Sequence, residues 1–249
     1  MKKRILHIGL LLVLCIVIIV TMFKVASMYA NASLKNVYVK NENELRFVTD
    51  TYISEQVRNS TLVKSHIFKD MNIDSMERYL SRNKFIENVD VIKTYSYEEG
   101  RMTGGLVVNI AQRRPIVRVK TSTDDYFLDK DGTRLDRVEL FATPVLLASG
   151  NIDETFAREN VVPLVNFIDK SDFWSSQVSQ VYVDKNKDIG LVMIFGAQLV
   201  VVGDASMLKE KFENLWSFYK DPVAASNMSK YKIINLKYDG QVVCSKKDM

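Results

Sequence analysis

Residues 106–119 read Leu-Val-Val-Asn-Ile-Ala-Gln-Arg-Arg-Pro-Ile-Val-Arg-Val. Apolar side chains recur with a period of two over residues 106–111, which predicts a strand. Pro115 has no backbone N–H, so a ladder through it must be interrupted or lie at an edge. The alternation then resumes over residues 117–119. A strand, a short connection containing two arginines and a proline, and a second strand indicate a chain passing between two folded units. A strand and turn inside one β-rich domain is the alternative.

The charge of the chain is confined to its N-terminus. Of 249 residues with a net charge of +4, residues 1–30 contain four basic side chains and no acidic one. The remainder holds 34 − 4 = 30 basic and 30 acidic residues and is neutral. Nucleic-acid recognition needs a concentrated basic face, so no nucleic-acid partner is predicted. The 47% of hydrophobic residues is enough for a substantial core.

An apolar run follows the first basic residues. Ile5 to Phe23 would span roughly 28 Å as a helix, close to the hydrocarbon thickness of a bilayer. We therefore expect a cytoplasmic N-terminus at 1–4, a transmembrane helix at 5–25 and a linker at 26–35, with the bulk of the chain outside the cytoplasm. A signal peptide cleaved at Ala30-Asn31-Ala32 is less favoured, because the run is longer than a typical signal core.

The next segment, residues 36–119, predicts a three-stranded α+β unit. We expect a strand at 37–39, helices beginning near Thr51 and Asp74, a strand at 89–95, a polar turn at 98–105 and the strand at 106–111. This order places two helices on one face of the sheet.

Residues 120–249 predict a mixed α/β domain with a mainly antiparallel sheet. Strands are expected at 126–128, 144–148, 178–183, 189–195 and 199–202, with a turn at 196–198. Asp129 to Gly132 superficially resembles a calcium loop but lacks its run of acids, so a hairpin turn is expected. An amphipathic helix carries one stripe formed by Leu208, Phe212, Leu215, Trp216 and Tyr219.

The last structured segment is the candidate binding site. Residues 233–238 and 241–244 alternate around Asp239-Gly240, a two-residue hairpin signal. Such a terminal ribbon can leave a free sheet edge that accepts an extended segment of a partner. Internal completion, or shielding by Lys246, Lys247 and Asp248, is the alternative. The candidate partner-binding residues are Leu236, Lys237, Tyr238, Gln241, Val242, Val243 and Cys244.

Four motifs carry a resemblance to known proteins. Asn83, Phe85, Ile86, Val89 and Val91 follow a pattern similar to the second half of the POTRA (polypeptide-transport-associated) domain. Gln112-Arg113-Arg114-Pro115, Tyr126-Phe127-Leu128-Asp129 before Gly132, and Asn235-Leu236-Lys237-Tyr238 resemble motifs of the FtsQ/DivIB family. The likeness covers the whole chain and is closest to the Bacteroidetes version of the family.

The resemblance implies a non-enzymatic divisome scaffold in the inner membrane, with a POTRA domain and an FtsQ-type β domain in the periplasm at the division septum. Its last strands would dock an FtsB/FtsL-like pair, and its POTRA domain other divisome membrane proteins. Two departures bear on that docking. Lys237 stands where the family usually has Arg, and a lysine cannot make the paired hydrogen bonds of a planar guanidinium group. Lys246 and Lys247 stand where some relatives carry an aromatic residue. A POTRA-bearing chaperone or secretion component remains the second hypothesis.

Catalysis is the third hypothesis, and the residues do not favour it. Outside the apolar run the chain has one histidine, His66, and one cysteine, Cys244, too few for a His/Cys zinc cluster. Glu98-Glu99 lie in a polar turn, and Ser65-His66 are sequence neighbours without an evident orienting acid. Cys15 lies in the apolar run, so it cannot pair with Cys244. We therefore predict no enzyme, no cofactor, no metal and no small-molecule substrate.

Overall fold

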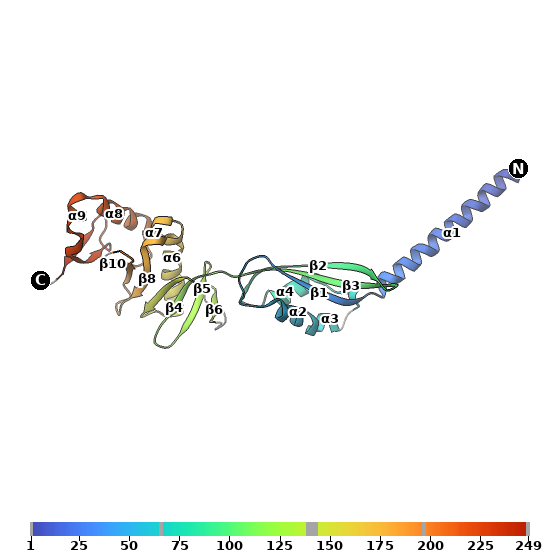
Figure 1. Ribbon diagram of the computed structural model, residues 1–249, viewed down its shortest axis with the longest axis horizontal. Helices are drawn as coiled ribbons and strands as arrows, with labels where there is room; N and C mark the ends of the chain where they lie inside the picture. The colour runs from blue at the N-terminus through green and yellow to red at the C-terminus, as the bar shows by residue number, and fades with distance from the viewer. Residues whose placement is uncertain (1, 65–66, 138–143, 196–197, 248–249) are drawn as a thin grey trace. The chain divides into compact units, whose positions relative to one another are not determined.

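The computed structural model describes residues 2–64, 67–137, 144–195 and 198–247 (Figure 1). Ser65, His66, Asp248 and most of the turn expected at 196–198 lie outside the described residues. The chain divides into two compact units, residues 1–112 and 113–249. Together they are α+β with one long apolar N-terminal helix, as the sequence predicts, and each unit has a mixed sheet.

The N-terminal helix α1 spans Lys2–Ala30. Within it, His7–Ala30 is long and apolar enough to cross a membrane, and its side chains are not buried in the protein. The apolar residues from Ile8 to Phe23 are instead largely exposed. This arrangement is compatible with a single-pass membrane protein.

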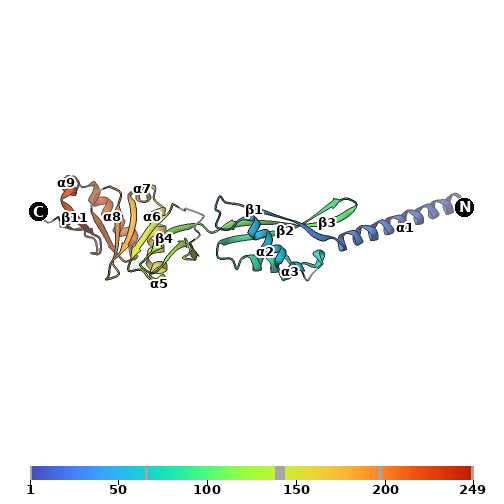
Figure 2. The same ribbon diagram turned by 60° about the horizontal axis from the view of Figure 1, so that its bottom comes forward.

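The sheet of the first unit has the order β1-β3-β2 (Figure 2). Strand β1 (Ser33–Asn41) runs parallel to the central strand β3 (Arg101–Gln112), and β2 (Ile86–Glu98) runs antiparallel to it. Helices α2 (Asp50–Asn59), α3 (Thr61–Lys64) and α4 (Ile73–Leu80), with the short turn η1 (Phe68–Asp70), cover one face. The core joins these helices to β3 through Ile53, Val57, Met76, Leu80, Leu106, Val108 and Ile110, all fully buried.

The β2–β3 hairpin is longer than predicted. Its turn is Glu99-Gly100, with φ of 50° and 79°, which is the left-handed pair of a two-residue hairpin turn. The polar turn expected at 98–105 was therefore wrong over residues 101–105. The two glycines there are strand residues, and a Cβ on Gly104 would lie 2.4 Å from the Phe68 ring. Glycine is placed here so that an aromatic ring can lie on the strand.

The second unit holds a nine-stranded sheet in the order β12-β11-β10-β9-β8-β7-β4-β5-β6. The strands are β4 (Pro115–Lys120), β5 (Asp125–Asp129), β6 (Arg134–Asp136), β7 (Leu146–Gly150), β8 (Val178–Val183), β9 (Ile189–Met193), β10 (Leu199–Gly203), β11 (Tyr231–Asn235) and β12 (Val243–Lys246). The pairs β4–β7, β7–β8 and β10–β11 are parallel, and the other five are antiparallel.

Strand β4 belongs to this second sheet, where it pairs with β5 and β7. The expected boundary at residue 119 instead placed it in the first unit. Pro115 explains the difference, because a proline is tolerated as the first residue of a strand and can begin a new ladder. Asp129 lies in a hairpin turn, as expected. Its carboxylate accepts hydrogen bonds from the backbone N–H groups of Asp131 and Thr133 (3.0 and 2.7 Å) and from Arg113 (2.9 Å).

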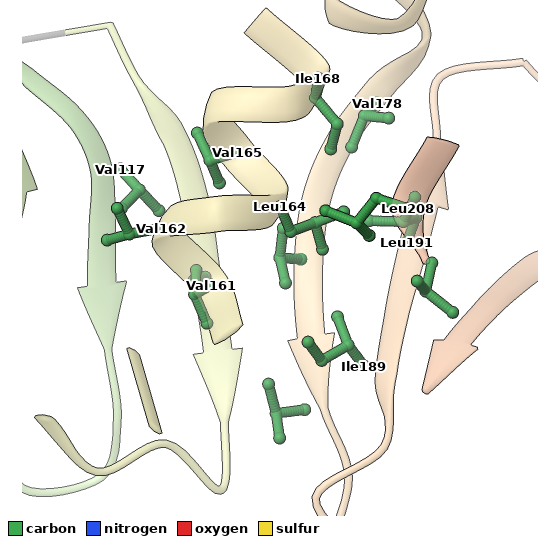
Figure 3. Packing of buried hydrophobic residues seen from close by; sticks show 14 of the residues in the cluster. Val117, Val161, Val162, Leu164, Val165, Ile168, Val178, Ile189, Leu191 and Leu208 are labelled. Carbon is green, nitrogen blue, oxygen red and sulfur yellow. The ribbon is translucent and has the colours of Figure 1, made fainter. Parts of the chain in front are cut away.

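Helices pack on one face of the nine-stranded sheet. They are α5 (Glu154–Phe156), the π-helix η2 (Ala157–Val161), α6 (Val162–Asp169), α7 (Asp172–Gln177), α8 (Leu208–Lys220), α9 (Pro222–Asn227) and the 3₁₀ helix η3 (Met228–Lys230). Figure 3 shows the packing of α6: Val162 and Val165 lie near Val117, while Leu164 lies near Leu191. In α8 the predicted stripe is buried at Leu208, Phe212 and Leu215, whereas Trp216 remains 39% exposed.

Candidate functional site

The candidate site is the edge of the second sheet formed by β12. The strand pairs antiparallel with β11, with Ile234 opposite Cys244 and Asn235 opposite Val243. It is the first strand in the sheet order, and within the described residues no strand pairs with its outer side. The predicted terminal ribbon therefore lies at an edge rather than in the middle of the sheet.

Two hydrogen bonds identify the peptide groups that face outward. Lys247 N–H donates to the carbonyl of Lys230 (2.9 Å), so residue 247 faces β11. Leu236 N–H donates to the carbonyl of Val201 (2.8 Å), so residue 236 of the neighbouring chain segment faces β10. Because peptide groups alternate in direction along a strand, Val243 and Ser245 face β11, while Cys244 and Lys246 turn their N–H and C=O groups to the free edge.

The turn before β12 differs from the prediction. Strand β11 ends at Asn235 and β12 begins at Val243, so seven residues replace the expected two-residue hairpin. Leu236 is only 3% exposed because it continues the ladder with β10 and enters the core. The reversal itself is a β-turn, in which Gln241 N–H donates to the Tyr238 carbonyl (3.1 Å) and Gly240 has φ of 65°. A positive φ at this third position is typical of a type II turn.

Lys237 is exposed, but an ion pair fixes its side chain to a neighbouring loop. Its Nζ lies 2.6 Å from the Asp188 carboxylate, in the β8–β9 loop, and this hydrogen bond raises the pKa of Lys237. Its aliphatic stem packs on Gly203, where a Cβ would lie only 2.8 Å away. Lys237 therefore anchors the 236–242 loop to the neighbouring strands.

Replacing Lys237 with alanine should loosen that loop without unfolding the sheet. We expect faster amide hydrogen exchange over residues 237–242 and little change in the denaturant midpoint, because exposed ion pairs contribute little to stability. Lys209→Ala is the matched control. The Lys209 side chain is 84% exposed, and its Nζ makes a long ion pair of 3.9 Å with the Glu213 carboxylate. Unchanged exchange in Lys237→Ala would mean that the loop is held by other contacts.

The remaining candidate residues separate into two groups. Tyr238, Gln241 and Val243 are exposed, with Tyr238 at 55% and Val243 at 42%. Val242 and Cys244 pack against the core, and burial raises the pKa of the Cys244 thiol. The side chains available to a partner are thus the exposed three, while Cys244 contributes its backbone.

A comparison with known families identifies the chain. A family model described as FtsQ/DivIB, C-terminal related, matches residues 114–245, more than half of the chain. The chain belongs to the FtsQ/DivIB family. No curated protein matches it. FtsQ/DivIB proteins are division scaffolds, so membership suggests a role in cell division and interaction with other division proteins.

In this FtsQ/DivIB protein, sequence reasoning missed the face of the sheet beside the edge. One row across β8–β12 faces the core, with Val181, Leu191, Val200 and Ile234 fully buried and Cys244 half-buried. The next residues along these strands lie on the opposite face, in a row formed by Tyr182, Gly190, Val201, Asn235 and Val243. Tyr182 and Val243 are exposed there, while Gly190 is buried beside the Leu199 side chain. The alternation of side chains along each strand predicts which residues share this face. Which residues of different strands line up with Val243 depends on the pairing register, which the sequence does not give.

Of the groups considered for catalysis in this FtsQ/DivIB protein, Glu98 and Glu99 lie at the β2–β3 turn. Glu98 pairs with Lys35 at 2.7 Å, and Glu99 occupies the left-handed hairpin turn beside it. His66 lies outside the described residues. Across the part of the chain that the structure describes, no three His, Cys, Asp or Glu side chains are placed to hold a metal ion.

Proposed function

We propose that this chain is a non-enzymatic divisome scaffold that docks an FtsB/FtsL-like partner by β-strand addition to the outer side of β12. One observation carries the proposal: Cys244 and Lys246 direct their peptide groups away from β11 at the edge of the sheet. An extended segment alongside can form up to about four backbone hydrogen bonds with these two residues.

In the proposed docking, different groups of the edge strand provide affinity and specificity. Backbone hydrogen bonds provide sequence-independent affinity, whereas side chains that alternate across the added strand provide specificity. Val243, exposed by 42%, offers an apolar contact beside the edge, whereas Tyr182 in the same row lies on β8, too far from β12 to reach the added strand. Tyr238 and Gln241 border the turn that precedes the edge. Lys237 is occupied by Asp188, so it positions this turn rather than binding the partner.

The proposal includes a membrane topology. Helix α1 crosses the inner membrane once, with Lys2, Lys3 and Arg4 in the cytoplasm and the two units in the periplasm at the septum. The apolar surface of α1, exposed along its length, supports the crossing. The first unit then acts as a POTRA domain that contacts other divisome membrane proteins. Its strand-helix-helix-strand-strand order and single helical layer support that assignment.

Proline at Lys246 tests the docking edge. The substitution removes one outward N–H but no hydrogen bond to β11, so the sheet should remain folded. We expect binding of a co-expressed FtsB/FtsL-like pair to weaken at least about tenfold, since a backbone hydrogen bond is lost and the ring obstructs the added strand. The measurement is co-purification from membranes followed by titration of the purified complex.

Two control variants define the result. Lys246→Ala keeps the backbone N–H and should bind as the wild type does. Ser245→Pro removes an N–H that faces β11, so it should disrupt β12 itself and change its hydrogen exchange. Wild-type affinity in Lys246→Pro would reject docking at this edge. A tagged fusion that does not localise to the septum would favour the chaperone or secretion hypothesis over the divisome role.

A further inference from the structure

The helix α1 continues beyond its apolar run. The run ends at Phe23, but the helix reaches Ala30, which adds seven residues or roughly 10 Å. The headgroup layer on each side of a bilayer is about 5–8 Å thick. If α1 crosses the membrane as proposed above, its last turn therefore lies at the outer level of the lipid headgroups.

That last turn contacts the first unit. The ring of Tyr29 lies 5.0 Å from that of Tyr95, and the Tyr95 ring lies 5.3 Å from that of Phe68, both edge to face. Phe68 belongs to η1, so the aromatic series connects α1 through β2 to η1. Such contacts hold the η1 surface near the end of the helix, and hence near the level of the headgroups.

A hollow of about 450 Å³ opens beside this contact. Residues 30–34, which leave α1, form one wall, and Val63, Ile67, Phe68 and Met71 form the other. Ile67 is 59% exposed although it is a large aliphatic residue. The hollow is thus lined largely by apolar side chains and continues the apolar surface of α1.

Three lysines lie next to residues that line this hollow, two in sequence and one across the Phe68 ring. Lys64 and Lys69 are exposed on either side of Ile67. Lys93 reaches across from β2, with its Nζ 2.8 Å from the Lys69 carbonyl and 5.6 Å from the centre of the Phe68 ring. Asp70 is the acidic residue of η1, so these four side chains carry a net charge of +2. An apolar centre with a basic rim is the pattern of surfaces that bind membranes through anionic lipids.

We propose that the surface formed by Lys64, Ile67, Lys69 and Lys93 binds the anionic phospholipid headgroups of the leaflet from which α1 emerges. The lysines contact the headgroup phosphates, and Ile67 enters the boundary between headgroups and acyl chains. This contact adds a second attachment to the membrane and limits the tilt of the first unit about the end of α1. It rests on the proposed crossing by α1.

Hydrogen exchange of the full chain in lipid nanodiscs tests this surface. One set of nanodiscs contains phosphatidylcholine alone, and the other equal parts of phosphatidylcholine and phosphatidylglycerol. We expect the amides of residues 67–71 to exchange about tenfold more slowly in the anionic nanodiscs, since two lysines near such a surface supply attraction of this order. The Lys64→Gln/Lys69→Gln variant should lose the difference between the two lipids.

Lys40→Gln/Lys84→Gln is the matched control. Both residues are exposed in the same unit, but they lie toward the other end of its sheet, near the β1 and β2 termini that approach Gln112. The control removes the same charge and should keep the lipid dependence. The inference would be overturned if the wild type exchanged at the same rate in both lipids. It would also be overturned if both double variants lost the difference between the lipids to the same extent. Failure of the chain to enter nanodiscs would instead reject the proposed membrane crossing.

Discussion

Replacing Gly150 with alanine should unfold the second unit, at a cost of about 4 kcal/mol or more. Gly150 ends β7 with φ of 107°, and a Cβ there would lie 2.0 Å from the backbone carbonyl oxygen of Val183. A clash with backbone cannot be relieved by rotating a side chain, so β7 and β8 must separate. These strands lie within the sheet and carry the buried residues Ala148 and Val181, so the core separates with them.

Tryptophan fluorescence during denaturant unfolding measures this effect. The chain has two tryptophans, Trp174 and Trp216, and both belong to the second unit. Gly240→Ala is the control, because Gly240 also has a positive φ of 65° but nothing lies within 4 Å of its Cβ position. It should cost only about 1 kcal/mol, the conformational penalty alone. Similar losses in the two variants would show that the contact with Val183 is not decisive.

Replacing Gln112 with leucine should destabilise the first unit by about 3–5 kcal/mol. The side chain is fully buried, and its Oε1 accepts from the N–H of Val48 at 3.0 Å. Its Nε2 donates to the carbonyls of Leu45 and Val48 at 3.1 and 2.9 Å. Leucine has a similar size but satisfies none of these backbone groups, so the N–H and the carbonyl of the buried Val48 lose this partner. The Leu45 carbonyl keeps its hydrogen bonds from Asn41 and Arg46.

The loss of stability in Gln112→Leu should be confined to the first unit, which distinguishes it from unfolding of the whole chain. Hydrogen exchange over residues 33–112 should accelerate in Gln112→Leu, while the tryptophan fluorescence transition of the second unit stays in place. Gln56→Leu is the control in the same unit, since Gln56 bonds only to the exposed Tyr52 hydroxyl and should change stability by less than about 0.5 kcal/mol. A shift of the tryptophan transition in Gln112→Leu would contradict the independence of the two units.

Much of the architecture could be predicted because it depends on local periodicity. The long apolar helix, the order of elements in the first unit and the stripe of α8 follow from patterns within short windows. The β2–β3 hairpin is longer than the sequence predicts, because Gly104 and Gly105 are typical turn residues but lie in a strand here. Their role depends on the Phe68 ring and the Thr94 side chain, which reach them only in the folded sheet.

The candidate site shows the same limit. The terminal pair of strands and its place at an edge were predicted, but Asp239-Gly240 was interpreted as a two-residue hairpin. A hydrogen bond from Leu236 to Val201 and an ion pair between Lys237 and Asp188 extend the loop. These partners are distant in sequence, so a local turn signal does not contain them. The direction of the peptide groups at Cys244 and Lys246 likewise follows from the register with β11 alone.

The order β1-β3-β2 also constrains how the first unit can be made. Its middle strand is the last of the three to leave the ribosome, so β1 has no neighbour in the sheet until residues 101–112 have emerged. Gln112, the final residue of that strand, then fastens the loop that follows β1. The chain must therefore extend some 70 residues beyond β1 before this sheet is complete, so the entropy of closing that loop falls on one late step of folding.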